Sequence, residues 1–150
     1  MGAPSTRTPQ GWELHFATKM ANALFAVEAA RRWAGDGITV NAVMPGVVRT
    51  NLTRHVDPEA LARFQENGAQ LPWKTKEQGA ATSVLLATSP LLDGIGGRYF
   101  EDCDEAEPLH PDNPHGGVAG HALDADQAAR LWEASVMSLD FTAASSPSYC

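Results

Sequence analysis

Two short stretches of the sequence carry residue types that could contribute to a ligand site. Lys19 lies in the first turns of a predicted apolar helix, and Pro45-Gly46 forms a turn directly after a predicted short strand. Ligands of α/β proteins bind outside the carboxyl ends of the strands in the sheet. A helix that brings an ammonium group to that end, together with a tight turn, therefore predicts part of a ligand site.

Residues 101–122 contain a second group of side chains with possible chemistry. Its thiol, carboxylate and imidazole groups are of the types that bind metals, and they belong to Cys103, Asp104, His110, His115 and His121. Their spacing matches no zinc pattern, and the segment is acidic and rich in Pro and Gly, which is typical of a loop. We therefore predict a solvated acidic loop and no metal site.

The composition is that of a soluble globular protein with one domain. The chain has 150 residues, of which 43% are hydrophobic and 19% are charged, and a chain of this length can enclose a real core. Its 18 acidic and 11 basic residues give a net charge of -7. This balance argues against a nucleic-acid partner, because phosphate contacts need clustered Lys and Arg.

Targeting and membrane signals are not found in the sequence. Residues 1–11 are small, polar and proline-containing, so we predict a disordered lead-in and no signal peptide. No apolar run approaches the length of a membrane helix, so no membrane partner is expected. The 2 cysteines do not make a disulfide framework, and a reduced, cytoplasmic setting is the default expectation.

A long helix and a strand are the elements expected to position Lys19 and the turn. Over residues 15–34 apolar side chains recur at helical spacing on two stripes. Such a helix must be covered on two sides, by a sheet and by a second body such as another subunit. Residues 38–43 alternate as a strand that Pro45 ends.

One polar residue interrupts the apolar helix. Glu28 lies midway along it and needs a partner, and Arg31 or Arg32, at i+3 and i+4, is the expected one.

Two further helices are predicted from the residues at which they begin. Asp57-Pro58 begins a short helix through Phe64, placed to lie over the turn as a flap. Thr75 and Gln78 form a capping box for a helix over residues 76–88. The side chains expected on its buried face are Ala80, Val84, Leu85 and Ala87.

Asp124 is the expected cap of the last helix. The side chains expected to point inward from it are Leu131, Trp132, Val136 and Leu139. Before this helix, residues 97–100 read as a short final strand.

Four linked motifs run along the chain: Ala-Asn-x-Leu-Phe-Ala-x-Glu, Gly-Ile-Thr-Val-Asn-Ala-Val, Pro-Gly-x-Val-x-Thr and Gly-Gly-Arg-Tyr-Phe-Glu-Asp-Cys. In this order they resemble the C-terminal half of the short-chain dehydrogenases/reductases, in the branch that includes retinol dehydrogenases and WW-domain oxidoreductases. The resemblance runs from about Trp12 to Leu139. We assign residues 12–140 to one domain of this type and residues 141–150 to a flexible tail.

The resemblance implies a partial, doubly wound Rossmann-like α/β sheet, with C-terminal helices and about two strands, completed by dimerisation or by a partner. It implies NAD or NADP as the cofactor, and dimerisation through helix 15–34. Lys19 corresponds to the lysine that holds the nicotinamide ribose and lowers the pKa of the catalytic tyrosine. The loop that meets the nicotinamide carboxamide and the phosphates corresponds to Pro45, Gly46, Val48 and Thr50.

Two departures from the family pattern limit the expected activity. His15 stands at the position of the catalytic tyrosine; an imidazole can exchange a proton near neutral pH, and a positive Lys19 favours its neutral form. The N-terminal half of the family, with its glycine-rich loop, ribose-binding acid and catalytic serine, is not found, and the run of residues 94–97 lies in a different context. The isolated chain is therefore expected to bind nicotinamide cofactors weakly and not to transfer hydride by itself.

Three functions are compatible with these residues. The first is an NAD(P)-dependent oxidoreductase of a carbonyl or alcohol substrate. The second is a catalytically silent module that uses helix 15–34 to form a homodimer or to pair with a full-length relative. The third is a cofactor-independent isomerase or cyclase that uses His15, Lys19 and the retained substrate pocket.

Overall fold

The structure, a computed structural model, describes residues 14–51, 73–113 and 116–144, together with residues 54, 59 and 62. For residues 14–19 and 140–144 it describes the backbone alone. The predicted lead-in over residues 1–11 and most of the predicted flap helix over residues 57–64 lie outside the described part.

The described elements alternate between helices and short strands, which confirms the mixed α/β class. The α-helices are α1 (Leu14–Trp33), α3 (Lys76–Thr88) and α4 (Ala125–Ala144). Short 3-10 helices are η1 (Ala34–Asp36), η3 (Pro90–Leu92) and η4 (Gly120–Leu123). The strands are β1 (Ala42–Met44), β2 (Val47–Val48), β3 (Trp73–Lys74), β4 (Tyr99–Glu101) and β5 (Asp104–Glu105).

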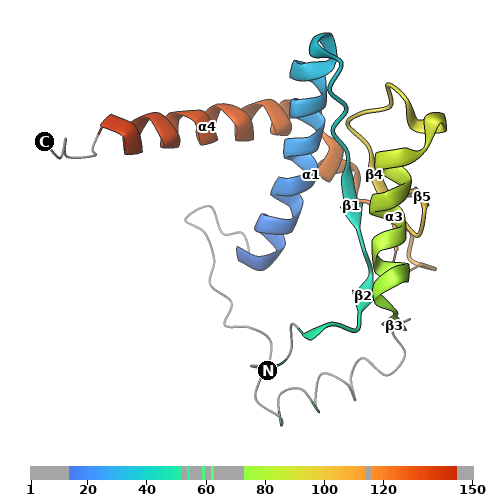
Figure 1. Cartoon of the computed structure of the whole chain (residues 1–150). Helices are drawn as coiled ribbons and strands as arrows, with labels where there is room; N and C mark the ends of the chain where they lie inside the picture. The colour runs from blue at the N-terminus through green and yellow to red at the C-terminus, as the bar shows by residue number, and fades with distance from the viewer. Residues whose placement is uncertain are drawn as a thin grey trace, which may run out of the picture.

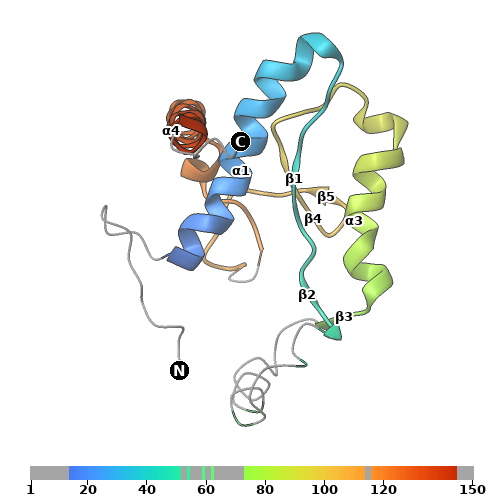
Figure 2. The ribbon, with the colours of Figure 1, turned by 60° about the vertical axis from the view of Figure 1, so that its left-hand side comes forward.

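The strands form two small sheets. In the first, β1 pairs in parallel with β4, and β4 pairs antiparallel with β5. In the second, β2 continues the chain beyond β1 and pairs in parallel with β3. Helices α1 and α3 lie on opposite sides of the β1–β4 pair (Figures 1 and 2). This arrangement is a fragment of a doubly wound α/β layer, in which no described strand pairs with the second edge of β1.

Helix α1 approaches the strands closely because small side chains lie between them. Ala23 and Ala26 of α1 belong to one buried cluster with Ala42 of β1. Further along the helix, a Cβ added to Gly96 would lie 3.1 Å from the Cβ of Ala30. The alanine-rich face therefore sets how near α1 lies to the sheet.

Helix α4 covers part of the second side of α1. The Phe25 ring of α1 stacks on Trp132 of α4 with centroids 5.6 Å apart, and Trp33 meets both rings edge-on, at 6.2 and 5.7 Å. The sequence predicted a second body, such as another subunit, on this side of α1. Helix α4 of the same chain takes that place in part. Beyond this contact α4 extends away from the sheet (Figure 1).

The partner predicted for Glu28 is confirmed, and both arginines take part. The buried carboxylate accepts hydrogen bonds from Arg31 at 2.9 and 2.6 Å and from Arg32 at 2.6 Å. Arg32 also places its guanidinium 4.9 Å from the ring centroid of Trp132. The network therefore joins the middle of α1 to α4.

The helix starts predicted at Thr75 and Asp124 are also confirmed. Thr75 and Gln78 exchange both bonds of the capping box, and the Asp124 carboxylate accepts a bond from the Gln127 amide at 2.8 Å.

The strand predicted over residues 38–43 is shorter and lies later, at Ala42–Met44. The residues just before Ala42 bond to the loop that precedes β4, and they are not paired with a strand. The Gly97 amide donates to the Val40 carbonyl at 2.8 Å, and the Asn41 side chain bridges Ile95 and Arg98.

The buried face predicted for α3 is wrong. Gly79 and Thr82 are its buried residues, whereas Val84 is 57% exposed. The reason is that α3 meets its neighbours through small residues, so the larger apolar side chains lie elsewhere on its surface.

On α4, Leu131 and Trp132 are half-buried as expected, but Val136 and Leu139 are exposed because α4 extends past α1. The acidic segment after β4 contains β5, which the sequence did not predict. It also contains an isolated bridge between Pro108 and Val118.

Candidate functional site

The candidate site is the segment that leaves the carboxyl end of β1. Pro45, Gly46, Val48 and Thr50 all lie on it: Pro45 and Gly46 form the turn, Val48 belongs to β2 and Thr50 follows β2. Pro45 and Thr50 are exposed, whereas Gly46 and Val48 are half-buried. The segment therefore presents one side to solvent and packs its other side on the protein.

Gly46 has a conformation that favours glycine. Its φ is +81°, in the left-handed region. The side chain of Lys74 lies across the position that a Cβ would take, with its Cδ, Cε and Nζ atoms 2.9, 2.7 and 2.6 Å from that point. Because Gly46 has no side chain, it can adopt the left-handed conformation of the turn, and Lys74 can approach its backbone closely.

Backbone pairing holds the next residues of the segment. Val47 lies opposite Trp73 and Val48 opposite Lys74 in the β2–β3 pair, and the Arg49 amide donates to the Lys74 carbonyl at 3.1 Å. The Arg49 guanidinium lies 5.6 Å from the centroid of the Trp73 ring. Residues far apart in the sequence therefore fix the path of the chain after β1.

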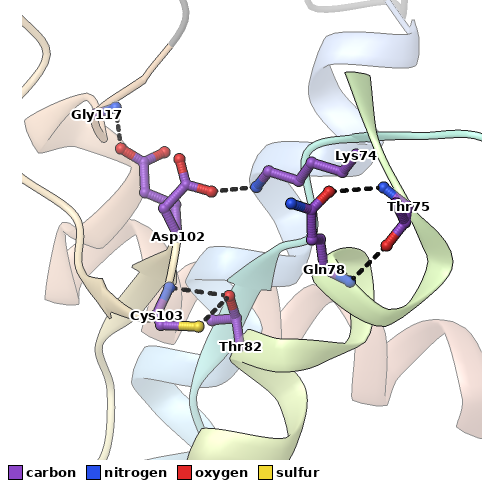
Figure 3. Close-up of polar contacts among 8 residues, drawn as sticks. Lys74, Thr75, Gln78, Thr82, Asp102, Cys103 and Gly117 are labelled. Carbon is purple, nitrogen blue, oxygen red and sulfur yellow. Dashed lines mark hydrogen bonds and ion pairs between the residues drawn. The ribbon is translucent and has the colours of Figure 1, made fainter. Parts of the chain in front are cut away.

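Figure 3 shows the contacts that join this region to the β4–β5 turn. The Lys74 ammonium forms an ion pair with Asp102. The Thr82 hydroxyl of α3 accepts a hydrogen bond from the Cys103 amide at 3.1 Å. Asp102 and Cys103 both have positive φ, +51° and +65°, as in the type I′ turns of tight hairpins.

The two candidate catalytic residues lie at the start of α1. Lys19 and His15 belong to its first part by backbone, while their side chains are outside the described atoms. Both views place the start of α1 at the end of the layer where β1 leaves the sheet (Figures 1 and 2). The structure thus brings the two parts of the predicted site to the same end of the fold. Contacts of Lys19 and His15 stay predictions.

Tyr99 is a phenol of the described chain, and its surroundings differ from those of an activated tyrosine. Burial raises its pKa, and the nearby Glu101 carboxylate adds to the shift. It packs against the buried cluster at the start of β4. A phenol that gives up its proton readily needs the opposite shift, so we assign Tyr99 a structural role.

Within the described residues, no group of three or more His, Cys, Asp or Glu side chains could hold a metal ion. Cys103 is exposed and forms no disulfide. None of the described helices has a stretch that is both long and apolar enough to cross a lipid bilayer.

Four residues that support the segment were missed by reasoning from the sequence: Gly79, Lys74, Thr82 and Asp102. A glycine inside a predicted helix is a signal of close packing, and Gly79 could have been found in this way. The other three act through contacts with distant parts of the chain, which leave no local pattern in the sequence.

Comparison with known proteins identifies the family. Residues 5–101 match the family model described as Enoyl-(Acyl carrier protein) reductase. The chain belongs to the short-chain dehydrogenase/reductase family. Among its relatives is a protein described as a probable oxidoreductase of Streptomyces antibioticus, which is 56% identical over 81% of this chain and 43% of its own length.

Two further relatives are more distant. Retinol dehydrogenase 14 of Mus musculus is 44% identical over 79% of this chain and 33% of its own length. Short-chain dehydrogenase/reductase prx1 of Penicillium rubens is 36% identical over 87% of this chain and 39% of its own length. The short-chain dehydrogenase/reductase chain described here thus spans less than half the length of these relatives.

Proposed function

We propose that this chain forms the nicotinamide-facing part of an NAD(P)-dependent oxidoreductase that acts on an alcohol or carbonyl compound. The observation that carries the proposal is the turn after β1. Gly46 in this turn has a φ of +81°, and the chain leaves β1 at the end of the fold at which α1 begins (Figure 1). Membership in the short-chain dehydrogenase/reductase family and the relatives described as oxidoreductases support it.

The residues of the segment fit the polar end of such a cofactor. The backbone of the turn can bond a carboxamide, and the exposed Thr50 carries a hydroxyl that can donate to phosphate oxygen. Lys19 would hold the nicotinamide ribose, and His15 would exchange the proton of the substrate. When bound, the cofactor supplies or accepts the hydride.

The test is an NMR titration of the 150-residue chain with NADH and NADPH. Weak binding is expected, in the millimolar range, with the largest shifts at the amides of residues 46–50. Lys19→Met is expected to weaken binding further, whereas Lys76→Met, which removes an exposed lysine from the start of α3, should leave it unchanged. Absence of shifts in residues 46–50, or equal binding by the parent and Lys19→Met, would overturn the proposal. Micromolar binding would show that the chain is more complete than we propose.

A second candidate function is a module that forms a homodimer, or pairs with a full-length relative, through α1 and the neighbouring part of α4. A cavity of about 320 Å³ lies between the two helices, lined by residues that include Phe25, Leu131 and Val136. Phe25 is 47% exposed and Val136 42% exposed, which suits an apolar partner surface.

Light scattering of the purified chain tests the second candidate. A dimer that Val136→Glu converts to monomer is the expected result, and Ala134→Glu is the matched control, since it adds the same charge at an exposed α4 residue outside the cavity lining. A parent chain that stays monomeric at all concentrations tested would remove the homodimer form of this candidate.

A further inference from the structure

We infer that Lys74 and Asp102 are positioning residues that hold the Pro45-Gly46 turn in its shape, and that this ion pair controls how the turn meets the nicotinamide end of the cofactor. The second part rests on the proposed function. Three segments far apart in the sequence meet here: the turn after β1, the end of β3 and the β4–β5 turn. Figure 3 shows the contact between the last two, from Lys74 to Asp102.

The first step of the argument is the contact between Lys74 and Gly46. The aliphatic part of the lysine occupies the space beside Gly46, within 3 Å of where a Cβ would lie. The turn therefore cannot move toward β3 unless this side chain moves first. Because residue 46 has no side chain, the lysine can cover its backbone directly.

The second step concerns the charge of Lys74. Its side chain is only 18% exposed, whereas that of Asp102 is 72% exposed. A charge that has lost most of its water needs a partner, and Asp102 is the one that faces it. Displacing Lys74 from Gly46 would therefore separate it from Asp102 as well, so the ion pair opposes movement of the turn.

The third step is that Asp102 is itself held in place. The Cys103 amide beside it bonds to the buried Thr82 hydroxyl at 3.1 Å, and the carboxylate of Glu101 accepts a bond from the Gly117 amide at 2.6 Å. The β4–β5 turn is thus fixed on both sides of Asp102. Because the Asp102 carboxylate is fixed, it can hold the flexible Lys74 side chain in one position, which a mobile carboxylate could not do.

The fourth step links the ion pair to the backbone of the site. The residue that supplies the ammonium also supplies the carbonyl that accepts from the Arg49 amide, at 3.1 Å. Movement of Lys74 would therefore affect two residues of the site. The Lys74 side chain contacts Gly46, and the Lys74 carbonyl bonds to the Arg49 amide. The exchange rate of the Arg49 amide hydrogen therefore reports on the Lys74–Asp102 pair without any ligand.

The experiment compares Lys74→Met, Asp102→Asn, the double variant and the control Lys76→Met by amide hydrogen exchange of the full chain. Asn tolerates the left-handed conformation of residue 102. Each single variant should speed exchange at Arg49 about fivefold, as for the loss of a moderately strong ion pair. The double variant should be no faster than the singles, because both remove one interaction. The Ala128 amide, which donates to the Asp124 carbonyl at the start of α4 at 3.0 Å, should be unchanged throughout.

Nicotinamide mononucleotide is the ligand probe, because it contains only the nicotinamide end. Its affinity should fall about fivefold in Lys74→Met and stay constant in Lys76→Met. Unchanged exchange at Arg49 in Lys74→Met, or equal acceleration at Arg49 and Ala128, would overturn the positioning role. If the parent chain bound neither this probe nor NADH, the proposed function would fail, while exchange at Arg49 would still decide whether Lys74 and Asp102 shape the turn.

Discussion

Gly79 of α3 lies so close to Val48 of β2 that a Cβ on residue 79 would come within 2.4 Å of Val48 Cγ2 and 3.0 Å of its Cγ1. Gly79 is buried in the first turn of the helix that the Thr75 capping box begins. Val48 belongs to the segment that carries the candidate site. The start of α3 therefore packs directly on that segment, and this close packing is possible because Gly79 has no side chain.

Gly79→Ala should destabilise the fold by roughly 1–3 kcal/mol, the usual cost of overpacking. Alanine is the better helix former by about 1 kcal/mol, but Val48 is β-branched and stiff, so it cannot rotate out of the way. Urea denaturation measures the difference. Gly35→Ala is the control, since nothing lies within 4 Å of its new Cβ; a Gly79→Ala protein as stable as this control would contradict the close contact.

Glu28 should make stability depend on pH in the acidic range. Hydrogen bonds from Arg31, opposed in part by burial and aided by Arg32, lower the pKa of Glu28 from 4.5 to about 2. A carboxyl group with a lowered folded-state pKa stabilises the fold above its unfolded pKa. This contribution should be complete above about pH 4.5 and should be lost as the pH falls toward 2.

Glu28→Gln tests this pH dependence. The variant should be less stable than the parent near pH 7, by roughly 1.5–3 kcal/mol for hydrogen bonds to a charged group. The two proteins should converge as the pH falls through the range between 4.5 and 2, as followed by urea denaturation at a series of pH values. Glu133→Gln, at an exposed residue of α4, is the control, and a gap between Glu28→Gln and parent that stays constant with pH would refute the assignment.

Local signals in the sequence predicted the starts of α3 and α4. The Thr75–Gln78 capping box and the Asp124 cap each depend on residues a few positions apart, so the pattern that encodes them can be read directly. The same holds for Glu28 and its arginines, which are i+3 and i+4 neighbours on one helix. The turn at Gly46 was likewise predicted, because proline and glycine mark the end of a strand.

What the sequence did not predict depends on contacts between distant residues. The buried face of α3 follows from Val48 and the β4–β5 turn, which favour small residues over the apolar ones that periodicity selects. Strand β5 follows a turn of Asp102 and Cys103, neither of which is a glycine, although both have positive φ. The ion pair of Lys74 with Asp102 spans 28 positions, so no local pattern announces it.

Trp132 should be the main contact that holds α4 on α1. Its ring stacks on Phe25, meets Trp33 edge-on and lies under the Arg32 guanidinium. Trp132→Ala should cost roughly 2–3 kcal/mol, less than a fully buried tryptophan because the ring is half-buried. Near-ultraviolet circular dichroism and urea denaturation measure the loss, with Met137→Ala, at a 67% exposed residue of the same helix, as the control. Equal stability of these two variants would mean that the ring cluster does not hold α4.

Thr82 should act through its hydroxyl oxygen, which accepts the Cys103 amide of the β4–β5 turn at 3.1 Å. Thr82→Val keeps the shape but removes the acceptor, and Thr82→Ser keeps the acceptor but removes a buried methyl group. Each should cost about 1 kcal/mol, by loss of a hydrogen bond in the first case and of apolar burial in the second. Stability alone therefore does not separate the two roles of the side chain.

Amide exchange at Cys103 separates them. Thr82→Val should speed exchange of the Cys103 amide hydrogen, because that amide loses its acceptor, whereas Thr82→Ser should leave its exchange close to that of the parent. Ser83→Ala, at an exposed neighbour on α3, should change neither stability nor exchange. Faster exchange at Cys103 in Thr82→Ser than in Thr82→Val would mean that the methyl group, and not the hydroxyl, fixes the turn beside Asp102.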